Sequence, residues 1–316
     1  NKIPDNWDDK SIVYFAGTSM LRWSANDIQT KGLGGSETAV IKLSEEWSKL
    51  GYNVTVFGNC ATETVNNVEY KHFSKFKPVD NFNILILWRL YGLSALSEIN
   101  SYKKLYVDLH DLPSQNFKIL YDLNKKIDKI FVKSEYHKNT LDKTIHDKVC
   151  VLENGLMTEI LDKAKVKNIT RNKKKLLYTS CYTRGLMDML KYGFPNIKKH
   201  IPEIEFHICY GMELVRDQKF KNEMNELLKQ DGIVNHHRLG QDELSELRES
   251  CYLHYYVGKF NETDCISVKE SLYSGLKVVV SNNGAFKERS KYFKIIKGDA
   301  TTKDVQENAS KYIIDL

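Results

Sequence analysis

Short apolar runs alternate with helical stretches along almost the whole chain, and this alternation constrains the fold more than any other feature. In the first half, a run such as 11–17 is typical of a strand buried on both faces. The stretch 36–50 places Val40, Leu43, Trp47 and Leu50 on one helical face and is followed by Gly51. Further strands are predicted at 54–58, 84–88, 104–108 and 129–132, and a further helix near 117–126. Strands that alternate with helices favour parallel pairing in a doubly wound α/β sheet.

A second series of the same kind begins after a lysine-rich stretch, residues 161–175, which we interpret as a polar linker. The 316 residues suit two domains of about 150 residues each. Strands are predicted at 176–178, 205–209, 234–239, 253–257 and 277–280, with helices at 186–197, 219–228, 242–248 and 266–273. We therefore expect two Rossmann-like doubly wound parallel-sheet domains that face a central cleft. They span 1–157 and 158–298, and residues 299–316 form a C-terminal helix that could cross back to the N-terminal domain.

Composition narrows the class of protein. Hydrophobic residues make up 41% and charged residues 28%, which excludes a largely disordered chain. No apolar run approaches the ~18–20 residues of a membrane span, and residues 1–10 contain no signal-peptide core. The net charge of +6 is modest for a nucleic-acid partner, so none is expected. The six cysteines form no CxxC pair, which favours a reducing cytoplasmic location without a structural metal.

A glycine-rich loop, Gly32-Leu33-Gly34-Gly35-Ser36-Glu37, is expected between the first strand and the first long helix. Glycine lets the backbone approach a ligand closely, and the free N–H groups of a helix start favour an anion. The alternative is a tight turn with Ser36 as the N-cap residue. The loop is not GxGxxG, so a nicotinamide dehydrogenase is weakly supported.

The second half contains the most informative spacing, in which Glu262 and Glu270 lie eight residues apart across a loop and a helix start. Eight residues of helix rise about 12 Å, which is close to the distance between the sugar and the ribose of a nucleotide sugar. The helix start between them would suit a diphosphate. Two Glu at this spacing are also common on solvated helix faces.

The stretch from Glu262 to Ser281 resembles the Glu-x7-Glu signature of the family 4 retaining glycosyltransferases, which have the GT-B fold. Further matches follow in family order at 34–38, 110–111, 134–136, 152–155 and 184–186. The chain thus resembles a compact member of this family. Its Lys, Asn, Ile and Tyr bias would suit a large DNA virus, with the host cytoplasm as the location, or an AT-rich bacterium.

The resemblance implies a role for each matched residue. Glu270 would bind the ribose hydroxyls, Glu262 would hold hydroxyls of the donor sugar, and Arg184 would neutralise charge on the leaving diphosphate. The remaining expected site residues contact the donor or lie near it. Backbone amides of Cys265, Ile266 and Ser267 would face the diphosphate, Gly34 and Gly35 would close on the donor, His110 would lie near the transferred sugar, and Arg238 and Leu239 would border the base.

Two positions depart from the family pattern. The second cation that usually accompanies the arginine is absent near Arg184, where Ser180 stands, and Lys259 is the candidate substitute. Asp264 takes a place where family members often have glycine, and its carboxylate would repel a diphosphate unless it turns away.

The resemblance implies a metal-independent retaining transfer of a hexose to an acceptor hydroxyl, without a cofactor. GDP-mannose is favoured over UDP-sugars as the donor, and the acceptor would be a glycan, a glycoprotein or a lipid-linked molecule. The chain would be a monomer or a homodimer, with at most peripheral membrane contact through the lysine-rich stretch. Two alternatives stay open: a nucleotide-sugar epimerase or hydrolase of the same fold, and a catalytically dead nucleotide-sugar-binding module.

Overall fold

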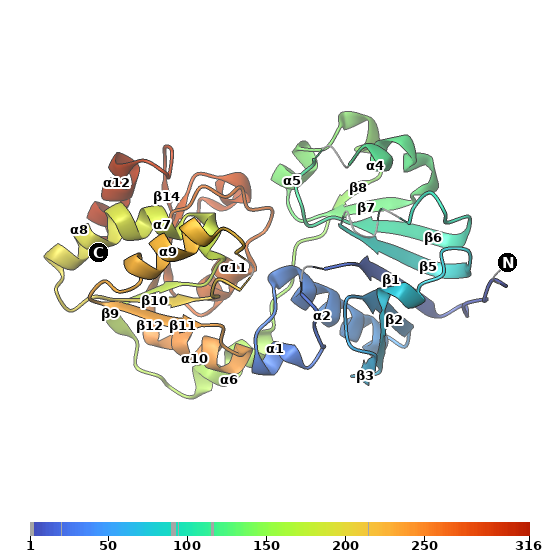
Figure 1. The fold of residues 1–316 in the computed structure, drawn as a ribbon, viewed down its shortest axis with the longest axis horizontal. Helices are drawn as coiled ribbons and strands as arrows, with labels where there is room; N and C mark the ends of the chain where they lie inside the picture. Colours follow the sequence, from blue (N-terminus) through green and yellow to red (C-terminus); the bar gives the residue numbers. More distant parts are fainter. Residues whose placement is uncertain (1–2, 20, 90–92, 94, 115–116, 214) are drawn as a thin grey trace. The chain divides into compact units, whose positions relative to one another are not determined.

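The computed structural model describes residues 3–19, 21–89, 93, 95–114, 117–213 and 215–316. Its contacts divide the chain into two compact units, drawn in Figure 1. The first comprises Asn1–Ile28 and Leu33–Asn154, and the second comprises Gln29–Gly32 and Gly155–Leu316. Within the described residues, no helix combines the length and the apolar character needed to cross a membrane.

The first unit is built on a sheet with the strand order β3-β4-β2-β1-β5-β6-β7-β8. In the described part of the chain its strands pair in parallel, apart from the antiparallel pair of β3 and β4. The strands are β1 (Ser11–Gly17), β2 (Asn53–Gly58), β3 (Glu63–Val65), β4 (Val68–His72), β5 (Asn81–Trp88), β6 (Ser101–Asp108), β7 (Lys129–Val132) and β8 (Val149–Val151). All residues of β1 are buried, as the apolar run predicts for a central strand.

Short helices and 3-10 turns connect these strands. They are α1 (Asp27–Thr30), α2 (Gly35–Lys49), η1 (Phe73–Lys75), α4 (Lys118–Asp122), η3 (Asn124–Lys126), α5 (Glu135–Asn139) and η4 (Lys143–Ile145). Val40 and Ile41 of α2 are buried, whereas Leu50 is the C-cap residue and is 74% exposed. Gly34, and not Ser36, is the N-cap residue, because α2 begins at Gly35, two residues earlier than a Ser36 cap would require.

The second unit is built on a six-stranded parallel sheet with the order β11-β10-β9-β12-β13-β14 among its described residues. Numbered from β9, this is the order 3-2-1-4-5-6 of a dinucleotide-binding fold. The strands are β9 (Asn172–Tyr178), β10 (Glu205–Cys209), β11 (Ile233–His237), β12 (Cys251–Tyr256), β13 (Lys277–Ser281) and β14 (Lys294–Ile296). The predicted α/β class, with two Rossmann-like doubly wound sheets, is confirmed.

Helices lie on both faces of this sheet, with α6 and α10 on one side and α8 and α12 on the other (Figure 1). The connecting elements are α6 (Thr158–Val166), η5 (Tyr182–Arg184), α7 (Leu186–Asp188), a π-helical turn η6 (Met189–Gly193), α8 (Phe194–His200), α9 (Gln218–Leu227), α10 (Gln241–Ser250), α11 (Ile266–Tyr273), η7 (Gly284–Arg289) and α12 (Lys303–Ile314). Right-handed helices between parallel strands cover both faces of such a sheet.

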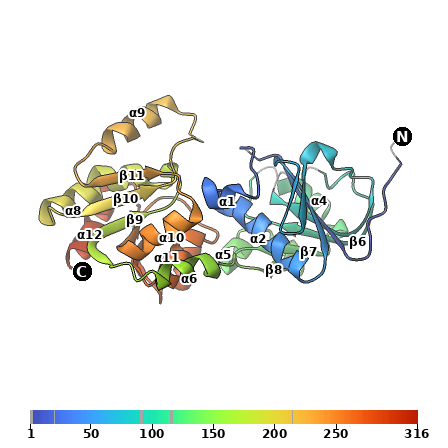
Figure 2. The ribbon, with the colours of Figure 1, turned by 90° about the horizontal axis from the view of Figure 1, so that it is seen from below.

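The lysine-rich stretch 161–175 is folded structure, and its interpretation as a linker is wrong. Residues 158–166 form α6, which packs against α10 and lies beside it in Figure 2. Leu161 and Ala164 are buried, whereas Lys163 is exposed and Lys165 lies over the Tyr273 ring at 3.6 Å. Leu161 and Ala164 are three residues apart, which places both on one face of the helix. The change between units falls before α6, at Asn154 and Gly155.

The C-terminal helix α12 belongs to the second unit, which corrects the crossing back to the first half that we considered. Ala309 and Ile313 are buried, and α12 packs against α8 and η6. The buried Gln306 amide donates to the carbonyls of Val257, at 2.9 Å, and Ala300, at 2.6 Å. These hydrogen bonds satisfy polar groups inside the core and thereby fix the helix on this unit.

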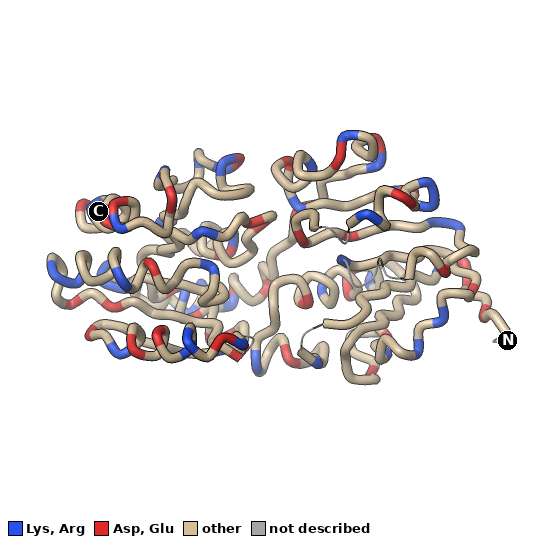
Figure 3. Tube along the Cα trace, turned by 45° about the horizontal axis from the view of Figure 1, so that its top comes forward, with Lys and Arg blue, Asp and Glu red and all other residues tan. Residues whose placement is uncertain are grey.

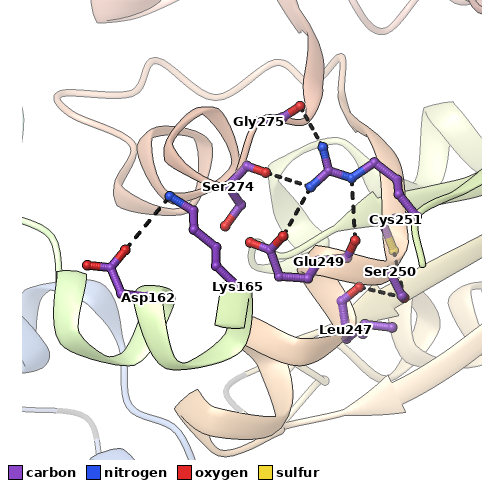
Figure 4. Close-up of polar contacts among 9 residues, drawn as sticks. Asp162, Lys165, Leu247, Glu249, Ser250, Cys251, Ser274 and Gly275 are labelled. Carbon is purple, nitrogen blue, oxygen red and sulfur yellow. Dashed lines mark hydrogen bonds and ion pairs between the residues drawn. The ribbon is translucent and has the colours of Figure 1, made fainter. Parts of the chain in front are cut away.

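Arg171, which lies in the lysine-rich stretch, makes hydrogen bonds at the ends of two helices, α10 and α11. Arg171 donates to the carbonyl oxygens of Ser274, at 2.6 Å, and Gly275, at 2.8 Å, just after α11. It also contacts the Glu249 carboxylate near the end of α10 at 3.2 Å, and these acceptors are drawn in Figure 4. A cation at the carboxyl end of a helix is stabilising. Arg171 therefore supports the two helices that carry Arg248 and Glu270.

Acidic and basic residues alternate along the traces of both units (Figure 3). Many ion pairs join side chains at the surface, such as Lys167 with Glu246 and Lys49 with Glu46. Exposed pairs of this kind contribute little to stability. The buried pairs described below are of a different kind.

Candidate active site

The strand order of the second unit brings the loop after β9 and the loop after β12 to the same edge of the sheet, at neighbouring strands. β9 and β12 are neighbours in the sheet although their first residues, Asn172 and Cys251, lie 79 positions apart in the sequence. The order of the strands reverses between them, and ligands of open α/β sheets bind at such a point, beyond the carboxyl ends of the strands. Arg184 follows β9 and Glu262 follows β12.

Arg184 and Glu262 form an ion pair at this position. The Arg184 Nη1 atom lies 2.7 Å from Glu262 Oε1, and the Tyr256 hydroxyl donates to the same oxygen at 2.6 Å. The Glu262 side chain is 6% exposed and that of Arg184 is 34% exposed. The guanidinium also lies 4.2 Å from the ring centre of Phe260, a cation–π contact. The two residues to which the resemblance assigns sugar and diphosphate contacts are thus held together at the surface of the unit.

Glycines bring the backbones of these loops close together. A Cβ atom on Gly185, whose φ is +119°, would lie 2.5 Å from the Gly258 Cα atom. A Cβ atom on Gly284, whose φ is +60°, would lie 2.3 Å from the Glu262 carbonyl oxygen. That oxygen accepts from the Ala285 amide at 2.8 Å. Any larger residue would displace the backbone, so these contacts fix the position of Glu262.

Glu270 lies on α11 and pairs with an arginine that the sequence analysis missed. The Arg248 Nη2 atom of α10 lies 2.7 Å from Glu270 Oε2, and both side chains are buried. Burial raises the pKa of Glu270 above its ordinary value, and Arg248 partly offsets this effect. The two glutamates of the predicted motif therefore each have an arginine partner.

The start of α11 lies between the two glutamates, and Cys265 occupies its N-cap position. Cys265 is buried, while Ile266 and Ser267 are partly exposed. The Asp264 carboxylate is fully buried and contacts Arg289 Nη1 at 2.6 Å and Lys269 Nζ at 3.3 Å. Two cations compensate its charge, which answers the concern that it would repel a diphosphate at this helix start.

The other residues predicted to contact the donor, Lys259, Arg238 and Leu239, lie on two separate loops. Lys259 is exposed in the loop after β12. Burial raises the pKa of Asp188 above its ordinary value, and the nearby Lys259 ammonium partly offsets this effect. Arg238 follows β11, stacks on the Tyr210 ring at 4.3 Å and lies 3.4 Å from Glu213. Leu239 follows it and is partly exposed.

In the first unit, the predicted glycine loop leads into α2. Gly34 is the N-cap residue of α2, with extended backbone, and Gly35 is the first residue of the helix. Gly34 has no side chain that could cap this helix start. The first amides of a helix lack partners within the helix, which suits an anionic ligand.

His110 lies beyond the end of β6 in a buried network. Its Nε2 atom lies 3.2 Å from Asp108 Oδ2, which also accepts from the Tyr14 hydroxyl at 2.5 Å. The second Asp108 oxygen contacts the buried Lys133 ammonium at 2.5 Å. Burial would raise the pKa of Asp108, but His110 and Lys133 outweigh it and hold that pKa below its ordinary value. Burial lowers the pKa of His110, so the ring is neutral near pH 7.

Sequence reasoning did not single out Arg248, Lys133 or Tyr14. One signal was present for Arg248, which comes four residues after Leu244 and directly after Leu247 on the apolar face of its helix. Tyr14 and Lys133 reach Asp108 across strands far apart in sequence. Among the described residues, no group of three His, Cys, Asp or Glu side chains could hold a metal ion.

Two Rossmann-like units, with charged loops at the strand-order reversal of the second, define a chain of the GT-B fold class. Solved structures share this fold. Sucrose-phosphate synthase from Thermosynechococcus elongatus matches with a TM-score of 0.73 and 11% identity, over 97% of this chain and 90% of that chain. The UDP-forming α,α-trehalose-phosphate synthase from Burkholderia vietnamiensis matches with a TM-score of 0.67 and 11% identity, over 100% and 91% of the chains.

A third similar structure is that of HepE from Anabaena in complex with UDP-glucose. Its TM-score is 0.64 and its identity is 11%, over 96% of this chain and 94% of that chain. No family model and no curated protein sequence matches the chain. At identities this low, the similarity establishes the fold, and function is argued from the site.

Proposed function

We propose that the chain is a glycosyltransferase that binds a nucleoside-diphosphate sugar on its second unit and transfers the hexose to an acceptor hydroxyl. The observation that carries this proposal is the Arg184–Glu262 ion pair at the strand-order reversal between β9 and β12. A cation and a carboxylate at this point suit the two chemically different parts of such a donor.

Each residue then has a chemical task in this mechanism. Glu270 accepts hydrogen bonds from the ribose hydroxyls, and Glu262 accepts them from the sugar. Arg184 stabilises the negative charge that develops on the departing diphosphate. The amides at Cys265, Ile266 and Ser267 support the same charge at the start of α11. The protein thus supplies position and charge, which are the main needs of a transfer between oxygens.

The solved structures guide the choice of donor. Of the similar structures, that of HepE is a complex with UDP-glucose and the trehalose-phosphate synthase is UDP-forming. We therefore propose a UDP-sugar as the first donor to test and keep GDP-mannose as the second. Retention at the anomeric carbon and membership of family 4 belong to this proposal on the strength of the sequence resemblance. A glycan, glycoprotein or lipid-linked acceptor is proposed on the same ground.

His110, Gly34 and Gly35 are proposed as the contribution of the first unit. The neutral His110 ring, held by Asp108, suits hydrogen bonding to a sugar hydroxyl. Substitution of His110 by Ala is expected to slow transfer while UDP binding stays within about twofold, since UDP lacks the sugar.

Calorimetric titration with UDP-glucose, GDP-mannose and ADP-glucose tests the proposal. Glu270→Gln is expected to weaken binding of the preferred donor by about tenfold or more. Arg184→Met is expected to slow transfer more than it weakens binding. Glu243→Gln is the matched control because Glu243 is exposed on α10. Failure of all three donors to bind would refute the proposal.

Two further outcomes would replace the proposal with another function. Conversion of the donor without any acceptor would indicate an epimerase or a hydrolase. Binding without turnover over a panel of acceptors would indicate a nucleotide-sugar-binding module. Transfer is expected to persist in a chelator, because Arg184 and the amides at the start of α11 are proposed to stabilise the diphosphate charge in place of a metal, and its abolition would contradict the proposed metal-independent route.

A further inference from the structure

We propose that Arg248 is a positioning residue for Glu270, which it holds in the orientation that a nucleotide ribose requires and whose carboxylate form it favours by its charge. The inference rests on the proposed function, because it assigns Glu270 to the ribose. It adds a residue that contacts no donor atom and acts through its carboxylate partner.

The geometry of the pair carries the inference. Arg248 is 0% exposed, and its Nη2 atom donates to Glu270 Oε2 at 2.7 Å. The Nε and Nη1 atoms of Arg248 have no hydrogen-bond partner within the described part of the chain. A buried guanidinium with so few partners is costly. Its one contact is with a glutamate of the predicted motif.

The position of Glu270 explains why such a pair is useful. Arg248 engages Oε2, whereas Oε1 makes no hydrogen bond to any described residue. Glu270 as a whole is 5% exposed. One oxygen is thus fixed by the protein, and the other remains for a ligand hydroxyl. A fixed carboxylate loses less conformational freedom when the ligand binds.

The titratable groups around Arg248 also support its proposed role. Arg248 lies on α10 and Glu270 on α11. The titratable groups that interact with Arg248 are His254 on β12, Cys209 on β10 and Cys251 at the start of β12, and the cations Lys175 and Arg171 also act on Cys251. Burial and then Arg248 lower the pKa of His254 to about 3, and burial raises the pKa of Cys209 to about 12 and that of Cys251 to about 11. These three side chains are therefore neutral near pH 7.

Arg248 is consequently the cation that counters burial at Glu270 among the described residues. Burial raises the pKa of Glu270 even with Arg248 present, and loss of this cation would raise it further. A neutral carboxyl accepts weaker hydrogen bonds than a carboxylate. Loss of Arg248 should therefore move the pH dependence of donor binding to higher pH than in the wild type.

The test measures the affinity of the full chain for UDP-glucose between pH 6 and 8.5, where the diphosphate diester keeps its charge. For Arg248→Met we expect binding about tenfold weaker than that of the wild type at pH 6. Its affinity should recover as the pH rises and Glu270 ionises, at higher pH than any corresponding change in the wild type. Arg248→Lys should restore most of the affinity at pH 6, because it restores the charge.

A double variant covers the case in which Arg248→Met fails to fold because it leaves a buried carboxylate unpaired. Arg248→Met with Glu270→Gln removes both charges and should fold. It should bind weakly at every pH. Recovery of its affinity with rising pH would show that a group other than Glu270 titrates, and would overturn the inference.

Two other results separate this inference from the proposed function. A folded Arg248→Met that binds UDP-glucose like the wild type at every pH refutes the positioning role alone. A wild type that binds none of UDP-glucose, GDP-mannose and ADP-glucose refutes the proposed function itself, and the positioning role with it.

Discussion

Substitution of Gly284 by Ala tests whether the glycine contacts set the position of Glu262. The added Cβ atom would lie 2.3 Å from the Glu262 carbonyl oxygen and 2.6 Å from its amide nitrogen. Real Cβ atoms essentially never approach closer than 3.0 Å, so the two segments must separate by at least about 0.7 Å. Both contacts are with backbone, which cannot turn aside as a flexible side chain would.

The size of the effect follows from this displacement. A shift of about 1 Å at a reacting group can cost on the order of a hundredfold in rate. A lost hydrogen bond to a charged group costs about 1.5–3 kcal/mol, which is roughly tenfold to a hundredfold in affinity. We therefore expect Gly284→Ala to weaken binding of UDP-glucose by at least about tenfold.

The assay compares UDP-glucose with UDP at one pH. Glu262 is proposed to hold the sugar, so affinity for UDP should stay within about twofold of the wild type. Gly51→Ala is the matched control, because Gly51 has a φ of +88° and open space around it. It carries a similar conformational cost, about 1–2 kcal/mol, without any steric contact, and should bind both ligands like the wild type.

Two results would contradict this reasoning. If Gly284→Ala binds UDP-glucose as tightly as the wild type, the contact does not set the position of Glu262, or Glu262 does not bind the donor. If UDP and UDP-glucose lose affinity equally, Glu262 does not recognise the sugar. Circular dichroism of both variants would show whether either loss is simply a loss of folding.

Two further predictions concern stability. Arg171→Met removes the hydrogen bonds to Ser274 and Gly275 (Figure 4). It should lower the free energy of unfolding of the second unit by about 1–3 kcal/mol. The loss should lie at the lower end of this range because Arg171 is partly exposed to solvent. Hydrogen exchange of α10 and α11 measures it, with the exposed Lys173→Met as control, and equal protection in both variants would contradict it. The second concerns pH. Burial, and then Arg248, lower the pKa of His254 from 6.5 to about 3. The unfolded chain therefore binds a proton that the folded chain does not, and stability is lost as the pH falls from about 6.5 towards 3, by about 1.4 kcal/mol per pH unit. Urea unfolding at pH 7 and pH 5 should show a smaller loss for His254→Asn than for the wild type, and an equal loss would refute the assignment.

Much of the fold could be predicted from local sequence patterns. Buried strands such as β1, β5 and β12 are continuous apolar runs, and α11 lies where the spacing predicts it. The hairpin of β3 and β4 was missed because these strands are short and partly exposed. The helix α6 was missed because the number of lysines obscured the two apolar positions, Leu161 and Ala164, that bury its inner face.

The residues of the candidate site could be predicted from the sequence, but their partners could not. The sequence named Glu262, Glu270 and Arg184 from a motif and its order along the chain. It could not pair Arg184 with Glu262, because they lie 78 residues apart and meet through the adjacency of β9 and β12. The concern over Asp264 was likewise settled by Arg289, 25 residues further along the chain.

The alternation of strands and helices could be predicted from the amino-acid sequence because it depends on periods of two to four residues, and the spacing of Glu262 and Glu270 is a local pattern as well. The partner of each charge depends on the three-dimensional fold. Arg248 faces Glu270, and Lys133 faces Asp108, because strand order brings distant segments together. A buried charge must find its counter-charge wherever the fold places one, and no local pattern records that place.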